Sequence, residues 1–341
     1  MVEAGEDAAS ASWWETFRNS PFLPATVLVL LVAAAAGLFA GSYTYNMANP
    51  TPRRIPTAVT GVPASEAEHV RFVAGMEQAL GASLKLHHYS GFAAAEEAVE
   101  EQKVFAILRE DGPRAAAPHL YVSSASGASV AQLLAQTAPK VGATVGSAVA
   151  VSDISPLQKG DPRGLAIFYI SLAAVILGFV GAIQLNVHAR ALHPWERICF
   201  IVAESMLGAF AIAAIVDWGL GALSLPFAES WAILAFTMVT SGMVFTMFNT
   251  LVGRWAMLPT WGLMVLLGNP SSGGAVSWPL LPSLLGRIGQ WLPPGASVNA
   301  QHTAVYFGGH QHVFPFAVLT VWAAGSTAVF LGWRHRHPGG R

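Results

Sequence analysis

Carboxylates inside long apolar stretches are the residues of this sequence best placed to do chemistry. Glu204 lies within the apolar stretch 198–218, which has Asp217 near its end. An ionisable side chain in a bilayer is costly and usually faces a bundle interior or a water-filled cavity. Glu204 is therefore the strongest single candidate for a functional residue, either as a proton carrier or as a hydrogen-bonded anchor. An arginine such as Arg254 or Arg190 would be its partner.

Other polar side chains lie near the ends of such stretches. Asp217 and Glu229 bracket a short turn, which indicates solvated carboxylates at a membrane interface. Gln184, Asn186 and Asn249 carry amides, which more often make hydrogen bonds between membrane helices than bind a substrate. The intramembrane polar candidates are Glu204, Asp217, Asn249 and Gln184.

The elements that must position these residues are membrane-spanning helices. A bilayer core of about 30 Å takes about 20 helical residues. Five apolar stretches meet that length, at 25–45, 165–187, 198–218, 230–252 and 314–333. A sixth, 255–267, is shorter. The first is interpreted as a retained span because polar residues precede it and its apolar run exceeds that of a signal peptide. The predicted fold is an α-helical integral membrane protein with about six transmembrane helices.

Composition supports this fold class. Hydrophobic residues make up 53% of the chain and charged residues only 11%, against about 25% charged in a typical soluble domain. Most of the charges lie between Arg53 and Arg163. A net charge of −1 gives no reason to expect nucleic acid as a partner. Cys199 is the only cysteine, which excludes an intramolecular disulfide and a cysteine metal cluster.

Lys and Arg in short loops predict the orientation, because they concentrate on the cytoplasmic side. With six crossings the arginines outside the long insert fall mainly on one side, at positions 18, 190, 197, 254, 334, 336 and 341. Arg287 is the exception. The chain is therefore predicted to be a multi-pass cell-membrane protein with both termini cytoplasmic. Its segments are a cytoplasmic 1–24, a first helix 25–45, an extracytoplasmic domain 46–163, a five-helix block 164–333 and a tail 334–341.

The region 268–313 predicts a break in the helical block. The stretch 255–267 reaches only about 20 Å as a helix, and the Gly- and Pro-rich residues 268–274 end it. A short amphipathic piece follows at 280–291. One interpretation is a broken segment that re-enters the outer leaflet; the other is an ordinary surface loop. The many apolar residues, including Trp278, Leu284 and Trp291, favour membrane contact.

The insert 46–163 predicts a small α/β domain. Residues 48–63 are rich in proline and are interpreted as an extended linker. Helical spacing follows at 65–80, 92–102 and 127–141, and strand patterns occur at 84–89, 104–108, 119–123 and 148–154. Glu96, Glu97, Glu100 and Glu101 form an acidic helix face, which is interpreted as solvated.

Enzyme and metal signatures are missing from the sequence. It has no GxxxxGK[ST], HExxH, GxSxG or GxGxxG pattern, so no catalytic residue and no cofactor is predicted. Two histidine groups could meet a metal ion, but their spacing is weak evidence, and no metal site is predicted. They are His87, His88 and His119, and His302, His310 and His312.

Two regions are candidates for contact with a partner or with the membrane surface. Trp13 and Trp14 precede the first span and suit a short interfacial helix. The basic, aromatic loop 188–197 contains Arg190, His193, Trp195 and Arg197; it suits either partner docking or anchoring at the interface.

Gly37 and Gly41 form a GxxxG pattern, which permits close helix packing within the bundle or across a dimer.

The whole layout resembles the permease subunits of type-2 ABC exporters, and most of all their phage-infection-protein-like branch. GFAAAEEAVEEQKVFAIL at 91–108 and LYVSSASG at 120–127 are similar to that family's helix–strand unit. LGNPSSGG at 267–274 and QWLPPG at 290–295 are similar to its loop before the last span. The resemblance in layout extends over essentially the full length, and these motifs are architectural.

The resemblance implies a permease subunit that exports amphipathic or hydrophobic substrates: lipid, glycan, peptide or drug. Two permeases would pair as a homodimer or heterodimer, and a separate cytoplasmic ATPase would dock on loop 190–197 and on the helix around Trp13 and Trp14. Some relatives act as phage receptors or secretion components, so a receptor or scaffold is the alternative. A third hypothesis is a proton-driven resistance protein that uses Glu204. Residue usage rich in Ala, Gly and Arg is typical of a bacterial source with a GC-rich genome.

Overall fold

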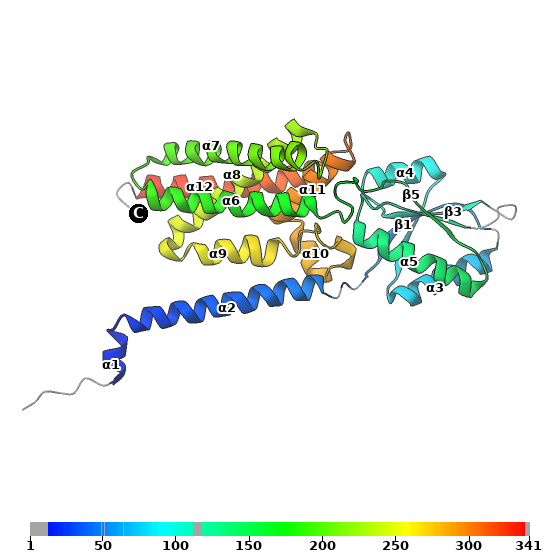
Figure 1. Cartoon of the computed structure of the whole chain (residues 1–341), viewed down its shortest axis with the longest axis horizontal. Coiled ribbons are helices and arrows are strands. Elements are labelled where there is room, and N and C mark those ends of the chain that lie inside the picture. Colours follow the sequence, from blue (N-terminus) through cyan, green and yellow to red (C-terminus); the bar gives the residue numbers. More distant parts are fainter. Residues whose placement is uncertain (1–12, 49, 51, 64, 112–117, 338–341) are drawn as a thin grey trace, which may run out of the picture.

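A computed structural model describes residues 13–48, 50, 52–63, 65–111 and 118–337. These residues form a bundle of long helices and an α/β unit at one end of it (Figure 1). We call that end the domain end. The short helix α1 (Trp13–Arg18) and the C-terminal residues lie at the opposite end, which we call the terminal end. The described N- and C-terminal residues thus share one end of the bundle.

Among the described residues, five helices are long and apolar enough to cross a membrane. They coincide with the five long stretches expected from the sequence, so the α-helical, membrane-embedded fold is confirmed. The five are α2 (Phe22–Met47), α6 (Ala166–His188), α7 (Pro194–Ala214), α8 (Phe227–Val252) and α12 (Val313–Arg336). Helix α7 continues into a π-helical turn, η1 (Ile215–Gly219).

The sixth expected stretch is a shorter helix. After a 3-10 turn, η2 (Gly253–Trp255), it begins as α9 (Met257–Trp261) and continues as a π-helix, η3 (Gly262–Gly268). Even with an α-helical rise throughout, Met257–Gly268 extends only about 18 Å. It runs alongside the bundle towards the domain end (Figure 1).

Helix α8 forms the centre of the bundle and packs against α6, α7 and α12. Its close approach to α6 depends on Gly178, where a Cβ would lie 2.7 Å from the Cα of Met238. Small residues let membrane helices approach this closely. Packing on several sides explains why so much of α8 is inaccessible, including Thr237, Thr240 and Ser241.

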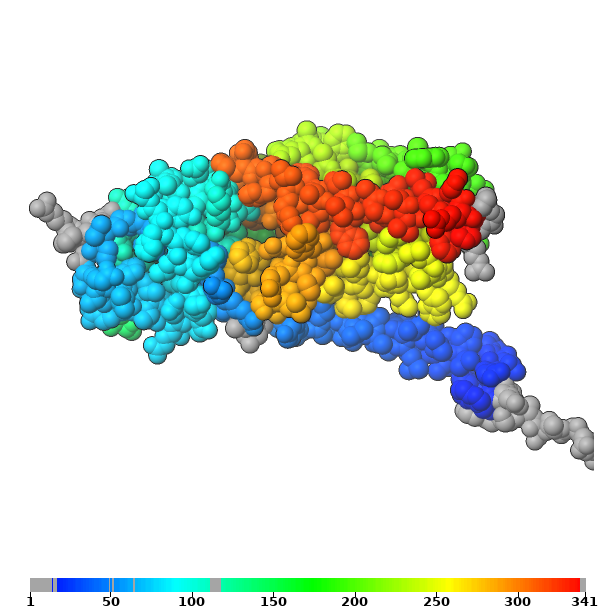
Figure 2. Space-filling view, turned by 180° about the vertical axis from the view of Figure 1, so that it is seen from behind, coloured from blue at the N-terminus to red at the C-terminus, as the bar shows by residue number. Residues whose placement is uncertain are grey.

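Helix α2 lies apart from the other long helices. Ser42 Oγ donates to the carbonyl of Leu266 at 2.6 Å, and Phe39 stacks on Trp261. The most apolar part of α2 has no buried residue. Figure 2 shows α2 against only one side of the molecule, along η3 and the segment that follows it. Most of the α2 surface therefore has no protein neighbour within the described chain.

The region between η3 and α12 is broken into short helices: η4 (Trp278–Leu280), α10 (Ser283–Gly289) and α11 (Pro293–Tyr306). Helix α11 is almost entirely buried against the bundle. Gln301 Nε2 donates to the carbonyl of Ser230, and Thr237 Oγ1 hydrogen-bonds Ser297 Oγ. This burial contradicts the alternative of an ordinary exposed loop. The backbone of the region between η3 and α12 is thus irregular where other protein segments surround it.

The α/β unit contains a five-stranded sheet in the order β2-β1-β3-β4-β5. All neighbouring strands are parallel except β3 and β4. Helices α3 and α5 pack on one face and α4 on the other. The strands are β1 (Ile55–Val62), β2 (Leu84–His88), β3 (Ala106–Asp111), β4 (His119–Val122) and β5 (Ala150–Asp153); the helices are α3 (Glu66–Leu80), α4 (Phe92–Glu100) and α5 (Ala128–Val145).

The linker interpretation of 48–63 was wrong for its second half, which is strand β1 between β2 and β3. Proline normally disfavours an interior strand because it lacks an N–H. Pro56 is tolerated because it stands second in the strand, and its carbonyl still accepts from Phe105 N at 3.0 Å. Gly61 has φ of 85° and lies so close to the carbonyl of Glu110 that no Cβ fits.

Candidate functional site

Glu204 lies in α7 where that helix crosses α6. Its carboxylate occupies the space over Gly181, where any Cβ would overlap it. The expected pairing with Arg254 or Arg190 is not found. Among the described residues no hydrogen bond or ion pair engages this carboxylate, and both arginines lie at the terminal end, around a separate cavity. Glu204 is half-buried, and its carboxylate lies against the backbone of Gly181 in α6.

The other polar candidates do not gather around Glu204. Asp217 lies in η1, where its backbone carbonyl accepts from Gly221 N at 3.1 Å. Gln184 is exposed on α6. Glu229 is not simply solvated as expected, because Gln311 Nε2 donates to its carboxylate at 2.9 Å and ties α8 to the segment before α12. The structure thus disperses three of the four candidates, and only Asn249 joins a polar cluster.

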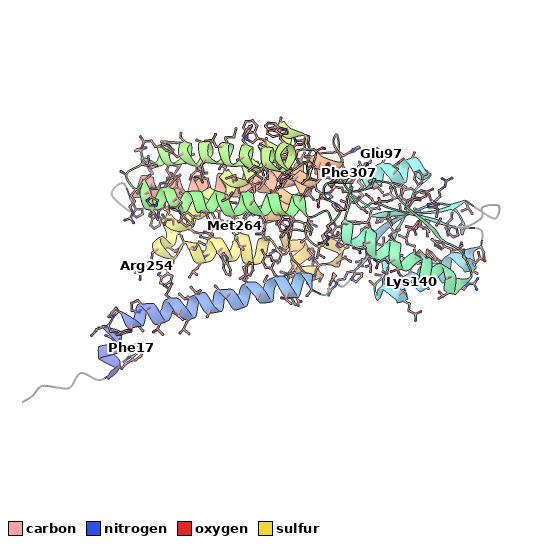
Figure 3. The ribbon with its side chains drawn as sticks, viewed as in Figure 1. Phe17, Glu97, Lys140, Arg254, Met264 and Phe307 are labelled. Carbon is pink, nitrogen blue, oxygen red and sulfur yellow. The ribbon has the colours of Figure 1, made fainter. Side chains whose placement is uncertain are left out.

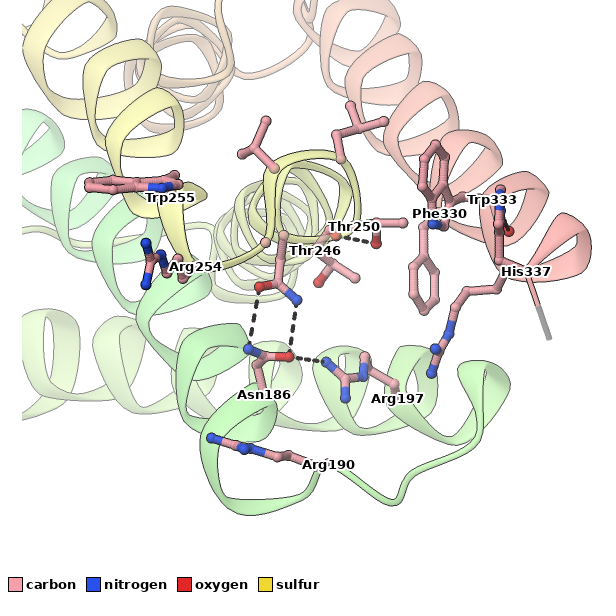
Figure 4. A pocket seen from close by; sticks show the side chains of 15 residues that line it. Asn186, Arg190, Arg197, Thr246, Thr250, Arg254, Trp255, Phe330, Trp333 and His337 are labelled. Carbon is pink, nitrogen blue, oxygen red and sulfur yellow. Dashed lines mark hydrogen bonds between the residues drawn. The ribbon is translucent and has the colours of Figure 1, made fainter. Parts of the chain in front are cut away.

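That cluster joins three helices at the terminal end (Figure 4). Asn186 in α6 and Asn249 in α8 exchange hydrogen bonds of 3.3 and 3.0 Å. Arg197 in α7 donates from one terminal nitrogen to the Asn186 side-chain oxygen at 3.0 Å. Arg197 is 7% exposed, and its Nε has no hydrogen-bond partner. The two amides therefore hold a buried guanidinium whose hydrogen-bonding capacity is only partly used.

A cavity of about 1260 Å³ opens beside this cluster. Four arginines and a histidine line it, together with the two asparagines and several aromatic side chains. No Asp or Glu of the described chain lines it. The charged and aromatic lining residues are Arg190, Arg197, Arg254, Arg334, His337, Trp255, Phe330 and Trp333. Arg254 also lies over the Trp255 ring at 5.4 Å, and Figure 3 shows it at the terminal end.

The docking candidates differ in accessibility. Arg190 and Trp195 are exposed, and Trp14 in α1 is exposed at the same end. His193 is the N-cap of α7, where its backbone N–H donates to Glu196 at 2.8 Å in a capping box. Arg197 does not belong to this exposed surface, because it is buried in the amide cluster. Trp13 begins α1, but its side chain lies outside the described residues.

Gly37 and Gly41 have no described neighbour within 4 Å of where a Cβ would stand. The GxxxG pattern therefore does not serve packing inside the described chain. Packing within the bundle was one of the two uses expected of it, and contact with a second chain is the other.

The α/β unit and the broken segment share one hydrophobic core. Val276, Leu280 and Leu281 are buried in the same cluster as residues of β1, β3, α3 and α5. Three polar contacts reinforce the junction: Ser129 Oγ to Ser277 Oγ at 2.8 Å, Gln102 Nε2 to Thr303 Oγ1 at 2.6 Å, and Arg53 N to the carbonyl of Pro279 at 2.9 Å. The unit that the sequence predicts within 46–163 thus completes its core with residues from the helical block.

A smaller cavity of about 260 Å³ lies at this junction, with His302 and His312 in its lining. His302 belongs to α11, which is not one of the five long apolar helices. Burial lowers the pKa of His302 to about 4, because a charged imidazole would lose its hydration there. The imidazole is therefore neutral at physiological pH.

The histidines set aside as metal ligands are spread over the fold. His87 and His88 lie on β2 and His119 on β4, with β1 and β3 between them. His310 Nε2 lies 3.8 Å from Glu100 Oε2. Within the described part of the chain, no group of three His, Cys, Asp or Glu is placed to hold a metal ion.

Sequence reasoning missed the joint action of Asn186, Asn249 and Arg197, although it noted each of them. All three are near the same predicted membrane face, and this shared depth was the available signal. Their lateral proximity depends on how α6, α7 and α8 pack.

Comparison of the chain with protein-family models, curated proteins and solved structures finds no match.

Proposed function

We propose that this chain is the permease subunit of an ABC-type exporter, which moves amphipathic or hydrophobic substrates out of the cell and is powered by a separate ATPase. The core shared by the α/β unit and the broken segment carries the proposal. Leu280 and Leu281 bind the segment to the α/β unit, while α11 is buried against α8 and α12. A shift of the bundle helices is therefore transmitted directly to the α/β unit.

Energy must come from another protein, because the sequence has no phosphate-binding loop for ATP. The exposed residues Arg190, Trp195 and Trp14 at the terminal end supply a basic, aromatic surface for such a partner. The concentration of arginines at this end supports a cytoplasmic terminal end and an extracytoplasmic α/β unit. The chain is then a multi-pass cell-membrane protein.

Pairing of two permeases is the second part of the proposal. Helix α2 has no buried residue in its most apolar part, and nothing described packs on Gly37 and Gly41. Lipid can cover such a helix, but a GxxxG face allows a second helix to approach closely. A second permease, identical or related, is the occupant we assign to this face.

The direct test is co-purification with an ATPase encoded beside this gene. The full chain and that ATPase are co-expressed, extracted in mild detergent and reconstituted in liposomes. We expect a stable complex whose ATP hydrolysis rises several-fold with the permease present and with lipid-like drugs added. Replacing both Arg190 and Trp195 by Ala should lower ATPase recovery at least fivefold, and the exposed Arg287→Ala should not. No recovered ATPase and no effect of ATP on transport would overturn the proposal.

A receptor or secretion scaffold is the second candidate, and the exposed edge of the sheet favours it. Strand β5 is an edge strand with Ala150, Ser152 and Asp153 exposed. An unpaired edge can accept a strand from another protein. If a charged substitution at the exposed Ala150 abolishes binding of an extracytoplasmic partner protein while ATP-dependent transport is absent, the scaffold function holds instead.

A further inference from the structure

The cavity at the terminal end has a charge pattern that calls for an anionic ligand. Arg190, Arg197, Arg254 and Arg334 surround one space, and no carboxylate of the described chain lines it. Like charges gathered in one space repel one another, and the repulsion is stronger where the protein limits hydration. An anion bound between them would relieve it.

The lining of this cavity includes a buried side chain, Arg197, that is held in place by other side chains, so the lining is more than a solvated surface. The side chain is 7% exposed and lines the cavity, held by Asn186, which Asn249 holds in turn. Its Nε has no hydrogen-bond partner among the described residues. A buried, unsatisfied donor of a charged group is costly, so a ligand oxygen at this position would stabilise the arrangement. Figure 4 shows Arg197 on the opposite side of the central asparagine pair from Arg254 and Trp255.

We infer that this cavity binds a phosphate group, and that its source is the headgroup of an anionic lipid. Arginine forks match phosphate oxygens in pairs, and basic pockets between membrane helices are suited to lipid headgroups. The rim supports a lipid source, since Trp255, Leu251 and Val252 are all exposed beside the cavity. Tryptophan is typical of the level where headgroups lie. The volume also exceeds what an inorganic phosphate ion needs.

The experiment uses the full chain in a maltoside detergent, which carries no phosphate. Three probes are titrated and their Kd values compared: dihexanoyl phosphatidate, inorganic phosphate and dihexanoylglycerol, which has the chains without the phosphate. We expect phosphatidate to bind at least tenfold more tightly than either other probe. Its affinity should also fall with rising salt concentration.

Arginine variants identify the site. Arg197→Gln and Arg254→Gln should each weaken phosphatidate binding at least fivefold. Arg336→Gln removes one charge from the same end, outside the cavity lining, and should change the Kd less than twofold. Because Arg197 is buried, its variant is first checked by gel filtration; Arg254 is exposed, so its variant keeps the test valid if Arg197→Gln fails to fold.

Each outcome decides between the sources. If inorganic phosphate binds as tightly as phosphatidate and depends on the same arginines, the phosphate site stands with a soluble ligand as its source. The inference is overturned if dihexanoylglycerol matches phosphatidate, because binding is then apolar. It is also overturned if Arg336→Gln weakens binding as much as Arg254→Gln, because general surface charge then accounts for the affinity.

Discussion

Two ionisable side chains of α7, Arg197 and Glu204, point into the bundle, and they differ in their hydrogen-bond partners. Arg197 is anchored by the amide of Asn186 beside a polar cavity. Glu204 has no partner among the described residues and rests against Gly181. A charge held by hydrogen bonds contributes to packing, whereas an unpaired charge in an apolar setting is retained at the expense of stability. Glu204 is therefore the better candidate for a purely functional role.

The first prediction concerns Glu204. Glu204→Gln removes the charge and keeps the shape, and it breaks no described ion pair. We expect the thermal midpoint in detergent to stay the same or rise by a few degrees. Arg197→Met should lower it, because the asparagine cluster loses its donor, which costs about 1–3 kcal/mol. A drop of more than 5 °C in Glu204→Gln would reveal a hidden partner. If the same variant abolishes transport while ATP hydrolysis is unaffected, proton coupling through Glu204 gains support.

The second prediction concerns His302. Its pKa of about 4 in the folded chain is below the ordinary value of 6.5, so the unfolded chain takes up the proton first. Stability is therefore unaffected above about pH 6.5 and falls as the pH decreases towards 4. Thermal midpoints measured from pH 7.5 to 4.5 should show a shallower decline for His302→Gln than for the parent chain. An exposed histidine variant, His188→Gln, is the control; equal slopes in all three proteins would contradict the expectation.

The sequence identifies these residues as candidates but does not predict which of them meet in space. Glu204, Asn186 and Asn249 stand out because they are polar within apolar stretches. Whether two of them meet depends on the rotation of each helix about its axis, which a uniformly apolar stretch does not encode. The sequence places Arg197 at the end of the basic, aromatic loop 188–197, yet α7 already begins at Pro194 and the Arg197 side chain is buried.

At the level of elements, the approach of α6 to α8 depends on one glycine. Gly178→Ala places a methyl group against the backbone of Met238, which cannot move aside as a side-chain end can. Overpacking of this kind costs about 1–3 kcal/mol, so we expect a thermal midpoint several degrees lower. Gly37→Ala in α2 meets nothing within the chain and should leave the midpoint of the detergent-solubilised monomer unchanged. Equal effects of the two substitutions would show that the α6–α8 contact is looser than described.

Strands and short helices were harder to predict than the spans. The five long helices follow from apolar length alone. Strand β1 was missed because Pro56 and Gly61 are typical of linkers, while its central place comes from pairing with β2 and β3, which lie farther along the chain. Helix α11 itself begins with Pro293, Pro294 and Gly295, residue types that usually indicate a helix end. Its burial depends on partners in α8 that local sequence does not reveal.

At the scale of the whole molecule, the α/β unit and the bundle are one packed body at their junction. The contact between Ser129 and Ser277, with 2.8 Å between the hydroxyl oxygens, joins residues 148 positions apart. The hydrophobic core extends across the boundary predicted at 163. A single sequence offers no signal for such a contact.

The junction can be locked by a disulfide. In a chain with Cys199→Ser, the double substitution Ser129→Cys and Ser277→Cys should form a disulfide on mild oxidation, because facing γ atoms this close fit its geometry. Because the shared core already holds the two parts together, we expect transport with the lock in place to stay within twofold of that of either single substitution, which is the control. A loss of transport that a reductant restores would show that movement between the two parts is required.

The position of α2 also has a consequence for synthesis of the chain. Its described side-chain bonds to the bundle join Ser42 to Leu266 and Tyr43 to Val265, which are 224 and 222 residues later. At about 5–20 residues per second, roughly 10–45 seconds separate their translation. Val276, Leu280 and Leu281 emerge later still, so the α/β unit must wait with an unfinished core. Ribosome-bound chains that end at residue 250 should therefore be more open to protease within 46–163 than full-length chains, and an insertase or chaperone would have to hold both parts during this interval.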